Sequence, residues 1–270
     1  MQYTLKKSLG QHFLHDEQMC KKIVAQINHS SGMRLVEIGP GGGAITKYLL
    51  NWKDIELKLI EVDDEKVDYL KHTYPQLEDK IIHQDVLKAS KPFDTSFSII
   101  GNFPYNISSQ IIFKAIENRK IVQTLVGMFQ LEVAKRICEG PGSKTYGIIS
   151  VLVQAYFKTE FMFSLDPFQF TPPPKVNSGV IKLTRKTQLT LNCDENLFFK
   201  IVKTSFQQRR KTIRNSLKVF NLSNNIKEDV KNSNENIESL ENKKKEIQTY
   251  LSNYIIDEEI ENNDINIIIN

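Results

Sequence analysis

A glycine-rich loop directly after an apolar stretch is the feature of this 270-residue chain that most constrains its fold. The stretch Arg34–Ile38 is typical of a buried strand, and glycines follow it at positions 39, 41, 42 and 43. Glycine has no Cβ, so backbone of this kind can approach a bound ligand closely. A tight turn from strand to helix would also use glycine, so the loop alone is a weak signal of a binding site.

Strands and helices alternate through the first 185 residues. Strand-like apolar segments span 34–38, 56–62, 80–83, 96–100, 121–129, 161–165 and 180–184, and helical spacing covers 44–50, 66–72, 132–139 and 147–157. Further helices are expected to begin at Asp16, which precedes an apolar helical face, and at Asn106 or Ser108. This alternation predicts an α/β, Rossmann-like fold with a mostly parallel sheet that binds ligands at the carboxyl ends of its strands.

The rest of the chain differs in pattern and in charge. Helical spacing over 194–220 predicts a small helical domain over 186–220, after a first domain over 1–185. Residues 221–270 hold 12 Asn, 10 Ile, 5 Lys and 11 Asp or Glu, and this acidic tail is expected to be frayed helix or disordered. The other 220 residues carry 31 basic and 21 acidic side chains, which favours a polyanionic partner.

Several classes of protein are disfavoured by composition. No run approaches about 18 apolar residues, so we expect no membrane span. Cys20, Cys138 and Cys193 are far apart and match neither a disulfide framework nor a zinc pattern, so we expect reduced thiols and no metal. A motif that begins at Lys6 leaves no room for a targeting peptide, and we therefore expect a cytoplasmic protein, which we also expect to be a monomer.

Ligand-type side chains follow the predicted strands at the edge where the glycine loop lies. Glu61 ends the second strand and could accept hydrogen bonds from both hydroxyls of a ribose. Asp85 follows the third strand, where it could accept from an adenine amine, and Asn102 follows the fourth. With Gly39 and Gly41 they indicate a nucleotide-type cofactor. The loop lacks the spacing of the dinucleotide fingerprint, whereas S-adenosylmethionine has no phosphate and does not need it.

The segment GNFPYN at 101–106 supplies what an exocyclic adenine amine needs in order to attack a methyl group. The lone pair of that amine is delocalised into the ring. Acceptors aimed at its hydrogens, here the Asn102 side-chain oxygen and the Phe103 carbonyl, would localise it. Pro104 stiffens the turn, and Tyr105 offers a ring on which the base can stack. These residues together predict transfer to adenine N6, in which positioning and preorganised acceptors do most of the catalysis.

Two further regions are candidates for contact with a nucleic acid. Phe170 opens the segment FTPPPKV, in which a rigid proline run could hold a second ring against an unstacked target base. Arg210, Arg214 and Lys218 lie four residues apart on one helical face and could hold phosphates. This basic stripe could be extended by Lys6, Lys7, Lys175, Arg209 and Lys211. A structural proline linker and a merely solvated basic face are the alternative interpretations.

On these residues the chain strongly resembles the ribosomal RNA adenine dimethyltransferases, the KsgA-like enzymes of the small ribosomal subunit. The resemblance runs from about Lys6 to Phe220, and its motifs stand at 7–14, 36–41, 101–108, 170–178 and 208–217. It implies a Rossmann-like class I S-adenosylmethionine-dependent methyltransferase domain with a small C-terminal helical domain. It also implies contacts to S-adenosylmethionine from His12, Leu14, Gly39, Glu61, Asp85 and Asn102.

The implied substrate is a pair of adjacent adenosines in the 3′-terminal hairpin of small-subunit (16S) rRNA, each dimethylated at N6, with a link to small-subunit biogenesis. The chain departs from the family at His12, where Asn is frequent, and at Phe103, where Leu is commoner. The usual leucine-rich closing helix is not recognisable after Phe220. Three alternatives stay open: a large-subunit rRNA adenine methyltransferase, a DNA adenine methyltransferase, and a non-catalytic assembly or transcription factor on the same scaffold.

Overall fold

The computed structural model describes residues 12–207 and 212–220, which form two compact units. One unit holds the described residues up to 138 together with 156–187, and the other holds 139–155 and the described residues from 188 onward. The division into domains over 1–185, 186–220 and 221–270 stays a prediction, and the 221–270 tail lies outside the described residues.

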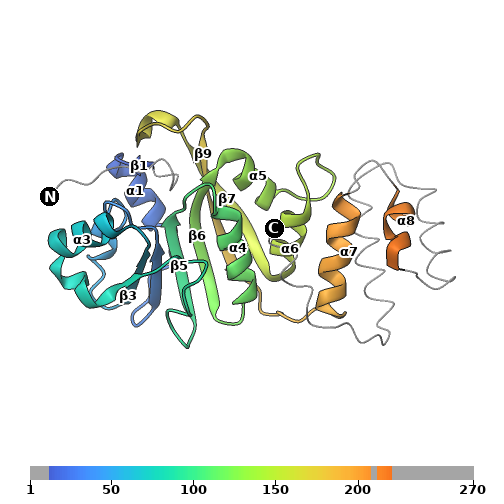
Figure 1. Cartoon of the computed structure of the whole chain (residues 1–270), viewed down its shortest axis with the longest axis horizontal. Coiled ribbons are helices and arrows are strands. Elements are labelled where there is room, and N and C mark those ends of the chain that lie inside the picture. The colour runs from blue at the N-terminus through green and yellow to red at the C-terminus, as the bar shows by residue number, and fades with distance from the viewer. Residues whose placement is uncertain (1–11, 208–211, 221–270) are drawn as a thin grey trace. The chain divides into compact units, whose positions relative to one another are not determined.

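The first unit is built on a seven-stranded sheet (Figure 1). In spatial order its strands are β4 (Ile81–His83), β3 (Glu56–Glu61), β2 (Arg34–Ile38), β5 (Phe97–Asn102), β6 (Val122–Gln130), β9 (Ser178–Arg185) and β7 (Phe157–Leu165). Neighbours from β4 to β6 are parallel, whereas β9 is antiparallel to both β6 and β7. The expected α/β, Rossmann-like sheet is therefore confirmed.

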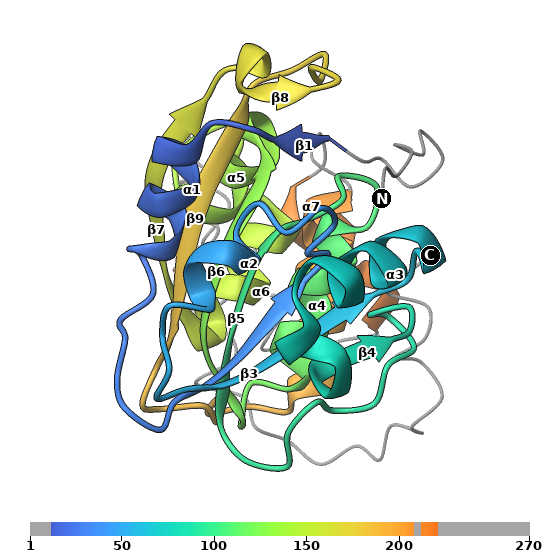
Figure 2. The same cartoon turned by 90° about the vertical axis from the view of Figure 1, so that its left-hand side faces the viewer.

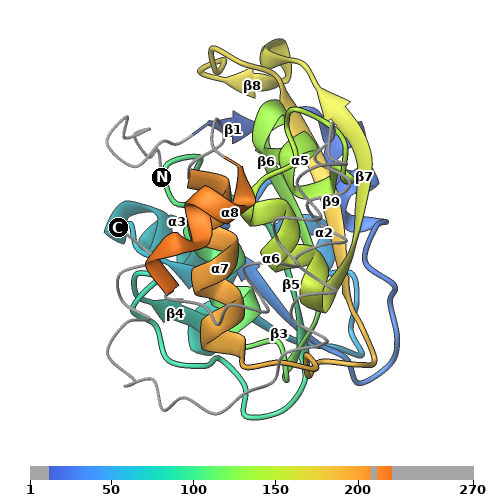
Figure 3. The ribbon, with the colours of Figure 1, turned by 90° about the vertical axis from the view of Figure 1, so that its right-hand side faces the viewer.

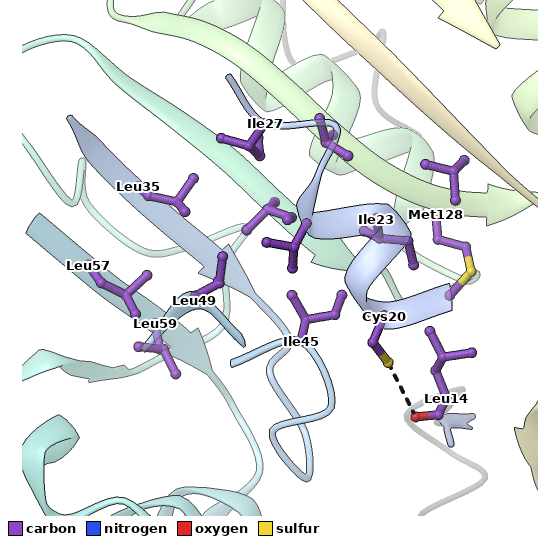
Figure 4. Packing of buried hydrophobic residues seen from close by; sticks show 14 of the residues in the cluster. Leu14, Cys20, Ile23, Ile27, Leu35, Ile45, Leu49, Leu57, Leu59 and Met128 are labelled. Carbon is purple, nitrogen blue, oxygen red and sulfur yellow. Dashed lines mark hydrogen bonds between the residues drawn. The ribbon is translucent and has the colours of Figure 1, made fainter. Parts of the chain in front are cut away.

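Helices cover both faces of this sheet because side chains alternate between the faces along each strand. Leu35, Leu57 and Leu59 pack with α1 (Glu17–Val24) and α2 (Thr46–Leu49) in a buried cluster, part of which is drawn in Figure 4. Val36 and Ile99 point the other way, toward α4 (Ser108–Glu117). Other helices of the unit include α3 (Asp64–Thr73), η2 (Pro75–Lys80) and α5 (Leu131–Cys138).

Helix α1 begins where the sequence indicated. The Asp16 side chain accepts hydrogen bonds from the backbone N–H groups of Gln18 and Met19, at 2.9 and 3.1 Å, and so caps two otherwise unpaired donors. Its apolar face buries Cys20 and Ile23 against the sheet. This packing fixes the place at which the chain coming from the N-terminal strand enters α1.

Two features were not anticipated from the sequence. A small second sheet pairs β1 (Phe13–Leu14) antiparallel with β8 (Phe170–Thr171), which follows the short helix η3 (Pro167–Gln169); Figure 2 shows the two strands together. The expected strand at 161–165 begins instead at Phe157, so the preceding helix, predicted through residue 157, ends at Tyr156. Pairing with β9 from Phe157 to Leu165, with one irregularity between Phe161 and Phe163, overrides the local helical pattern.

The described part of the second unit is helical, and its elements appear in Figure 3. Helix α6 (Ile148–Tyr156) ends at its border, and α7 (Glu195–Gln207), α8 (Ile213–Ser216) and η4 (Leu217–Phe220) follow. Along α7 the buried side chains recur at helical spacing, from Phe198 through Ile201 and Val202 to Phe206. The Phe206 ring meets Tyr146 edge to face, with 6.0 Å between centroids. Within the described ranges, no helix is long and apolar enough to cross a membrane.

Candidate active site

A pocket of about 240 Å³ opens at the carboxyl ends of β2, β3 and β5. It brings together all of the residues that were expected to bind the cofactor, which are His12, Leu14, Gly39, Gly41, Glu61, Asp85 and Asn102. Phe103, Pro104 and Tyr105 of the predicted catalytic turn also line it. The sequence reasoning missed other lining residues, among them Glu37, Ile45, Lys66 and Leu87.

The glycine loop needs its glycines for their backbone conformation. Gly39 and Gly41 have φ angles of +66° and +55°, in the left-handed region that side chains other than glycine rarely adopt. A Cβ on Gly39 would lie 3.7 Å from Cδ of Pro104, so the loop passes directly beside the catalytic turn. The loop and the turn therefore form adjoining walls of one pocket.

The Glu61 carboxylate is held by backbone donors. Its Oε2 accepts from the N–H of Gly41 at 3.0 Å, and its Oε1 accepts from the N–H groups of Val62 and Asp63 at 2.9 and 3.1 Å. Burial, with 6% of the residue exposed, raises the pKa of this carboxyl despite these bonds, which favour its ionised form. The group is thus a rigid, pre-aimed acceptor at the rim of the glycine loop.

Glu37 is a second carboxyl in the same pocket wall and is only 1% exposed. Burial raises its pKa to about 8, and the negative charge of Glu61 adds to that effect. Its Oε2 accepts a hydrogen bond from the Thr46 hydroxyl at 2.7 Å. Desolvation therefore favours the neutral form of this carboxyl over its ionised form. The signal for it in the sequence was a charged residue inside an apolar strand just before the glycines.

Asp85 stands in a tight turn after β4. Its Oδ1 accepts from the N–H of Leu87 at 2.9 Å, and its carbonyl accepts from the N–H groups of Lys88 and Ala89 at 3.0 and 2.8 Å. These bonds close residues 85–89 into one compact turn. Because Asp85 lines the pocket, this turn presents a carboxylate to whatever the pocket binds.

Asn102 is the last residue of β5, and its amide orientation is fixed by the residue just before β1. Its Nδ2 donates to the carbonyl of His12 at 3.0 Å. With the amide nitrogen committed to that contact, Oδ1 is the atom available to accept a hydrogen bond on the opposite side. The acceptor that the sequence reasoning assigned to Asn102 is therefore geometrically compatible with the fold.

The Phe103 ring explains two glycines outside the cofactor loop. The ring is buried, and a Cβ on Gly101 or Gly127 would fall 2.6 and 2.1 Å from its nearest atoms. On another side it meets Phe129 edge to face at 5.3 Å. The sequence reasoning used only the carbonyl of Phe103, whereas in the structure its ring anchors the catalytic turn to β5 and β6.

Tyr105 is half-buried and tied to β9, which lies beyond β6 in the sheet. Its hydroxyl lies 2.5 Å from Oγ of Ser178 in β9, and its ring centroid lies 5.7 Å from that of His12. Burial raises the pKa of the phenol, so it stays neutral at physiological pH. The hydroxyl therefore fixes the orientation of the ring at the pocket, as a stacking platform would require.

Phe170 lies elsewhere than was expected. Its side chain is 2% exposed, belongs to the buried cluster together with Leu14, and does not line the pocket. A second stacking ring from this position stays a prediction. Two contacts nevertheless join this region to the pocket: the β1–β8 pairing, and a 2.8 Å hydrogen bond between Nδ1 of His12 and the carbonyl of Pro172. Phe168, two residues earlier, is 73% exposed and was missed.

The basic residues are described only in part. Lys175 and Lys218 are exposed. Arg214 falls in α8, but its side chain lies outside the described part of the structure, as do the residues Lys6, Lys7, Arg209, Arg210 and Lys211. Their RNA-binding role stays a prediction. Among the side chains that the structure describes, no group of three or more His, Cys, Asp or Glu could hold a metal ion.

Comparison with known proteins agrees with this geometry. The family model of the ribosomal RNA adenine dimethylases matches residues 2–257. The Ribosomal RNA small subunit methyltransferase A of Flavobacterium johnsoniae is 54% identical over 228 residues, covering 83% of this chain and 87% of the relative. The protein of the same name from Cytophaga hutchinsonii is 50% identical over 222 residues, covering 81% of this chain and 86% of the relative.

Solved structures also match. A dimethyladenosine transferase from Plasmodium falciparum superposes with a TM-score of 0.69 at 26% identity, over 82% of this chain and 80% of its own. The 23S rRNA methyltransferase ErmE gives a TM-score of 0.67 at 21% identity, over 88% of this chain and 99% of its own, which supports the fold alone. The pocket, the catalytic turn and the extent of the family match lead to one conclusion: this chain belongs to the ribosomal RNA adenine dimethylase family.

Proposed function

We propose that this protein uses S-adenosylmethionine to dimethylate the N6 amines of two adjacent adenosines in the 3′-terminal hairpin of small-subunit rRNA. The observation that carries the proposal is the position of the Asn102–Tyr105 turn in the same pocket as Glu61 and Asp85. Glu61 and Asp85 suit a nucleoside cofactor, and the Asn102–Tyr105 turn suits an adenine amine. The names of the relatives, which are small-subunit rRNA methyltransferases, support this choice of substrate.

The pocket fits S-adenosylmethionine better than a phosphate-bearing cofactor. Glu61 is a rigid acceptor for ribose hydroxyls, and its charge would repel a phosphate at that place. Asp85 would accept from the cofactor's adenine amine, and the backbone of Gly39 and Gly41 would lie along the ligand. His12, Leu14 and Asn102 complete the set. The bound cofactor supplies an electrophilic methyl group on a sulfonium.

The residues of the catalytic turn prepare the target amine. Oδ1 of Asn102 and the carbonyl of Phe103 accept the two N6 hydrogens, which localises the nitrogen lone pair. The target base stacks on the ring of Tyr105, which keeps its amine level with these two acceptors. No strong base is needed before attack, because the N6 proton becomes acidic only as the new bond forms. The protein thus contributes orientation and fixed acceptors.

The target adenosine must leave its stack to reach this pocket. Shape and base displacement then select the target, while the basic stripe defined by Arg210, Arg214 and Lys218 would hold phosphates without reading sequence. We place the activity in the cytoplasm, on a monomer, and couple it to small-subunit biogenesis because the substrate is part of the assembling particle.

The test combines the purified protein with labelled S-adenosylmethionine and under-methylated small subunits. Nucleoside mass spectrometry and primer extension should show dimethyladenosine at two adjacent positions near the rRNA 3′ end. Methylation confined to large-subunit rRNA would overturn the substrate assignment. Salt-sensitive binding without any methylation would identify a non-catalytic assembly factor instead.

Asn102→Ala provides the matched test of mechanism. It should lower the rate of transfer by about a hundredfold or more, because a preorganised acceptor is removed, while RNA binding persists. Asn51→Ala, which changes an exposed asparagine outside the pocket, is the control and should behave as wild type. Normal turnover in the Asn102 variant would refute the assigned role.

A further inference from the structure

Two lysines hold the loop that carries Asp85. Nζ of Lys114, from α4, donates to the carbonyls of Leu87 and Ala89, both at 2.9 Å. Nζ of Lys58, from β3, donates to the carbonyl of Pro92 at 2.8 Å, and lies 4.5 Å from the centroid of the Phe93 ring. Both contacts engage backbone carbonyls of the connection between β4 and β5, so they act on its path.

This connection packs only in part against the sheet: Val86, Ala89 and Phe93 are buried, yet a cavity lies beside it. Residues 86, 89–92 and 94 form one wall of a cavity of about 660 Å³, whose other walls come from α4 and from strands β2, β3, β5 and β6. Packing against the sheet would normally fix a loop of this kind. Here the Lys114 side chain, which also lines the cavity, reaches across from α4 to the loop.

The two carbonyls that Lys114 holds belong to the same turn as Asp85. Leu87 donates its N–H to the Asp85 carboxylate, and Ala89 donates its N–H to the Asp85 carbonyl. The ammonium group therefore fixes the two residues that fix Asp85. A movement of this turn into the cavity would carry the carboxylate away from its place in the cofactor pocket.

Electrostatics point in the same direction. Burial lowers the pKa of the Lys114 ammonium overall, and the negative charges of Glu117 and Asp85 offset part of that effect. The interaction with Asp85 is thus favourable when both groups are ionised. A bond from a charged donor to a carbonyl contributes more than a neutral one, so replacing the ammonium should release the turn.

We infer that Lys114 is a positioning residue that holds Asp85 at the pocket and thereby supports recognition of the adenine base of the cofactor. This inference rests on the proposed function, because it takes Asp85 as the adenine acceptor. Lys114 does not line the cofactor pocket, so its effect must pass through the turn.

The test compares Lys114→Met with wild type and with Lys120→Met, which removes an exposed lysine just beyond α4. Calorimetry with S-adenosylhomocysteine should show binding about tenfold weaker in Lys114→Met, from the loss of charge-assisted bonds, and unchanged binding in Lys120→Met. The KM for S-adenosylmethionine should rise by a similar factor while kcat at saturation stays near wild type. Lys114→Arg, which can donate to both carbonyls, should restore most of the affinity.

A second measurement separates this inference from the proposed function. Amide hydrogen exchange over residues 84–90, without cofactor, should be faster in Lys114→Met than in wild type or Lys120→Met. If wild type binds no S-adenosylmethionine, the proposed function fails, while the exchange data still report on the turn.

If wild type binds the cofactor and Lys114→Met binds it equally well, the inference is overturned. The inference would also be overturned if the losses of cofactor affinity in Asp85→Asn and Lys114→Met added up in the double variant, because the effects of residues that act through one another are not additive.

Discussion

Gly127→Ala tests how the catalytic turn is anchored. The new Cβ would lie 2.1 Å from Cε2 of Phe103, and 2.8 and 2.9 Å from Cδ2 and Cζ. Carbon atoms in good contact are about 3.5–4.0 Å apart, so the ring must retreat by more than 1 Å. It has no free path, since it is only 1% exposed, meets Phe129 edge to face and lies against the backbone of Gly101.

The expected cost follows from overpacking a closed site. Extra methyl groups in well-packed cores cost about 1–3 kcal/mol, and this contact belongs at the upper end because ring and strand are both rigid. Urea unfolding followed by fluorescence of Trp52, the one tryptophan of the chain, reports on the unit that contains the sheet. Displacement of the Phe103 carbonyl by about 1 Å should also slow methyl transfer on the order of a hundredfold.

Phe103→Leu supplies the decisive comparison. Leucine lacks the ring atoms that the new Cβ would strike, so the double variant should be less destabilised than the sum of the single variants. Gly140→Ala, at a position with nothing within 4 Å of an added Cβ, is the control and should be neutral or slightly stabilising. Wild-type stability in Gly127→Ala, or strict additivity in the double variant, would refute the reasoning.

Three further predictions concern the carboxyls and the tyrosine of the pocket. Glu37 has a folded-state pKa of about 8 against an ordinary value of 4.5, so the stability that it contributes is present at low pH and is lost as pH rises through that interval. Glu37→Gln should remove this pH-dependent fall in the free energy of unfolding, measured by urea titration at several pH values. A pH profile identical to that of wild type would show that Glu37 is ionised in the folded state. Glu61→Gln should weaken cofactor binding by about 2 kcal/mol, because a charged acceptor for ribose hydroxyls is lost. Since burial raises the pKa of Glu61, the affinity of wild type for the cofactor should decline as pH falls, whereas that of Glu61→Gln should stay constant. Calorimetry at several pH values measures both affinities. Tyr105→Phe should cost about 1–2 kcal/mol of stability, because it leaves the buried Ser178 hydroxyl without its partner, yet slow transfer by less than about tenfold, since the ring remains. A loss of single-turnover rate as large as that of Asn102→Ala would instead place the hydroxyl in the chemistry.

Most of the fold followed from local patterns. The strand at Arg34–Ile38 has the bounds expected from its apolar run, and Asp16 caps α1 as its position indicated. Alternation of strands and helices predicted a mostly parallel sheet, and the pocket lies at the carboxyl ends of its strands. These features are readable in the sequence because backbone propensity, capping and side-chain period are set within a few residues.

The residues of the site were also largely readable, since they stand directly after strands whose ends meet at one edge. Asn102, Glu61 and Asp85 reach one pocket for that reason. Sequence reasoning failed where a contact joins distant segments. It extended a helix through Phe157, where the sheet recruits a strand, and it did not foresee that the Phe170 ring packs in the core.

The sequence by itself thus determined the order of the strands along the chain, the glycine loop and the place of the Asn102–Tyr105 turn after β5. Only the tertiary structure decided how deeply the side chains of the site are buried and which contacts hold them in place. It buries Glu37 and so raises the pKa of its carboxyl, encloses the Phe103 ring between Gly101 and Gly127, and sets Lys114 against the turn of Asp85. Desolvation and steric contact depend on atoms that are far apart in the chain, and no local pattern of residues encodes them.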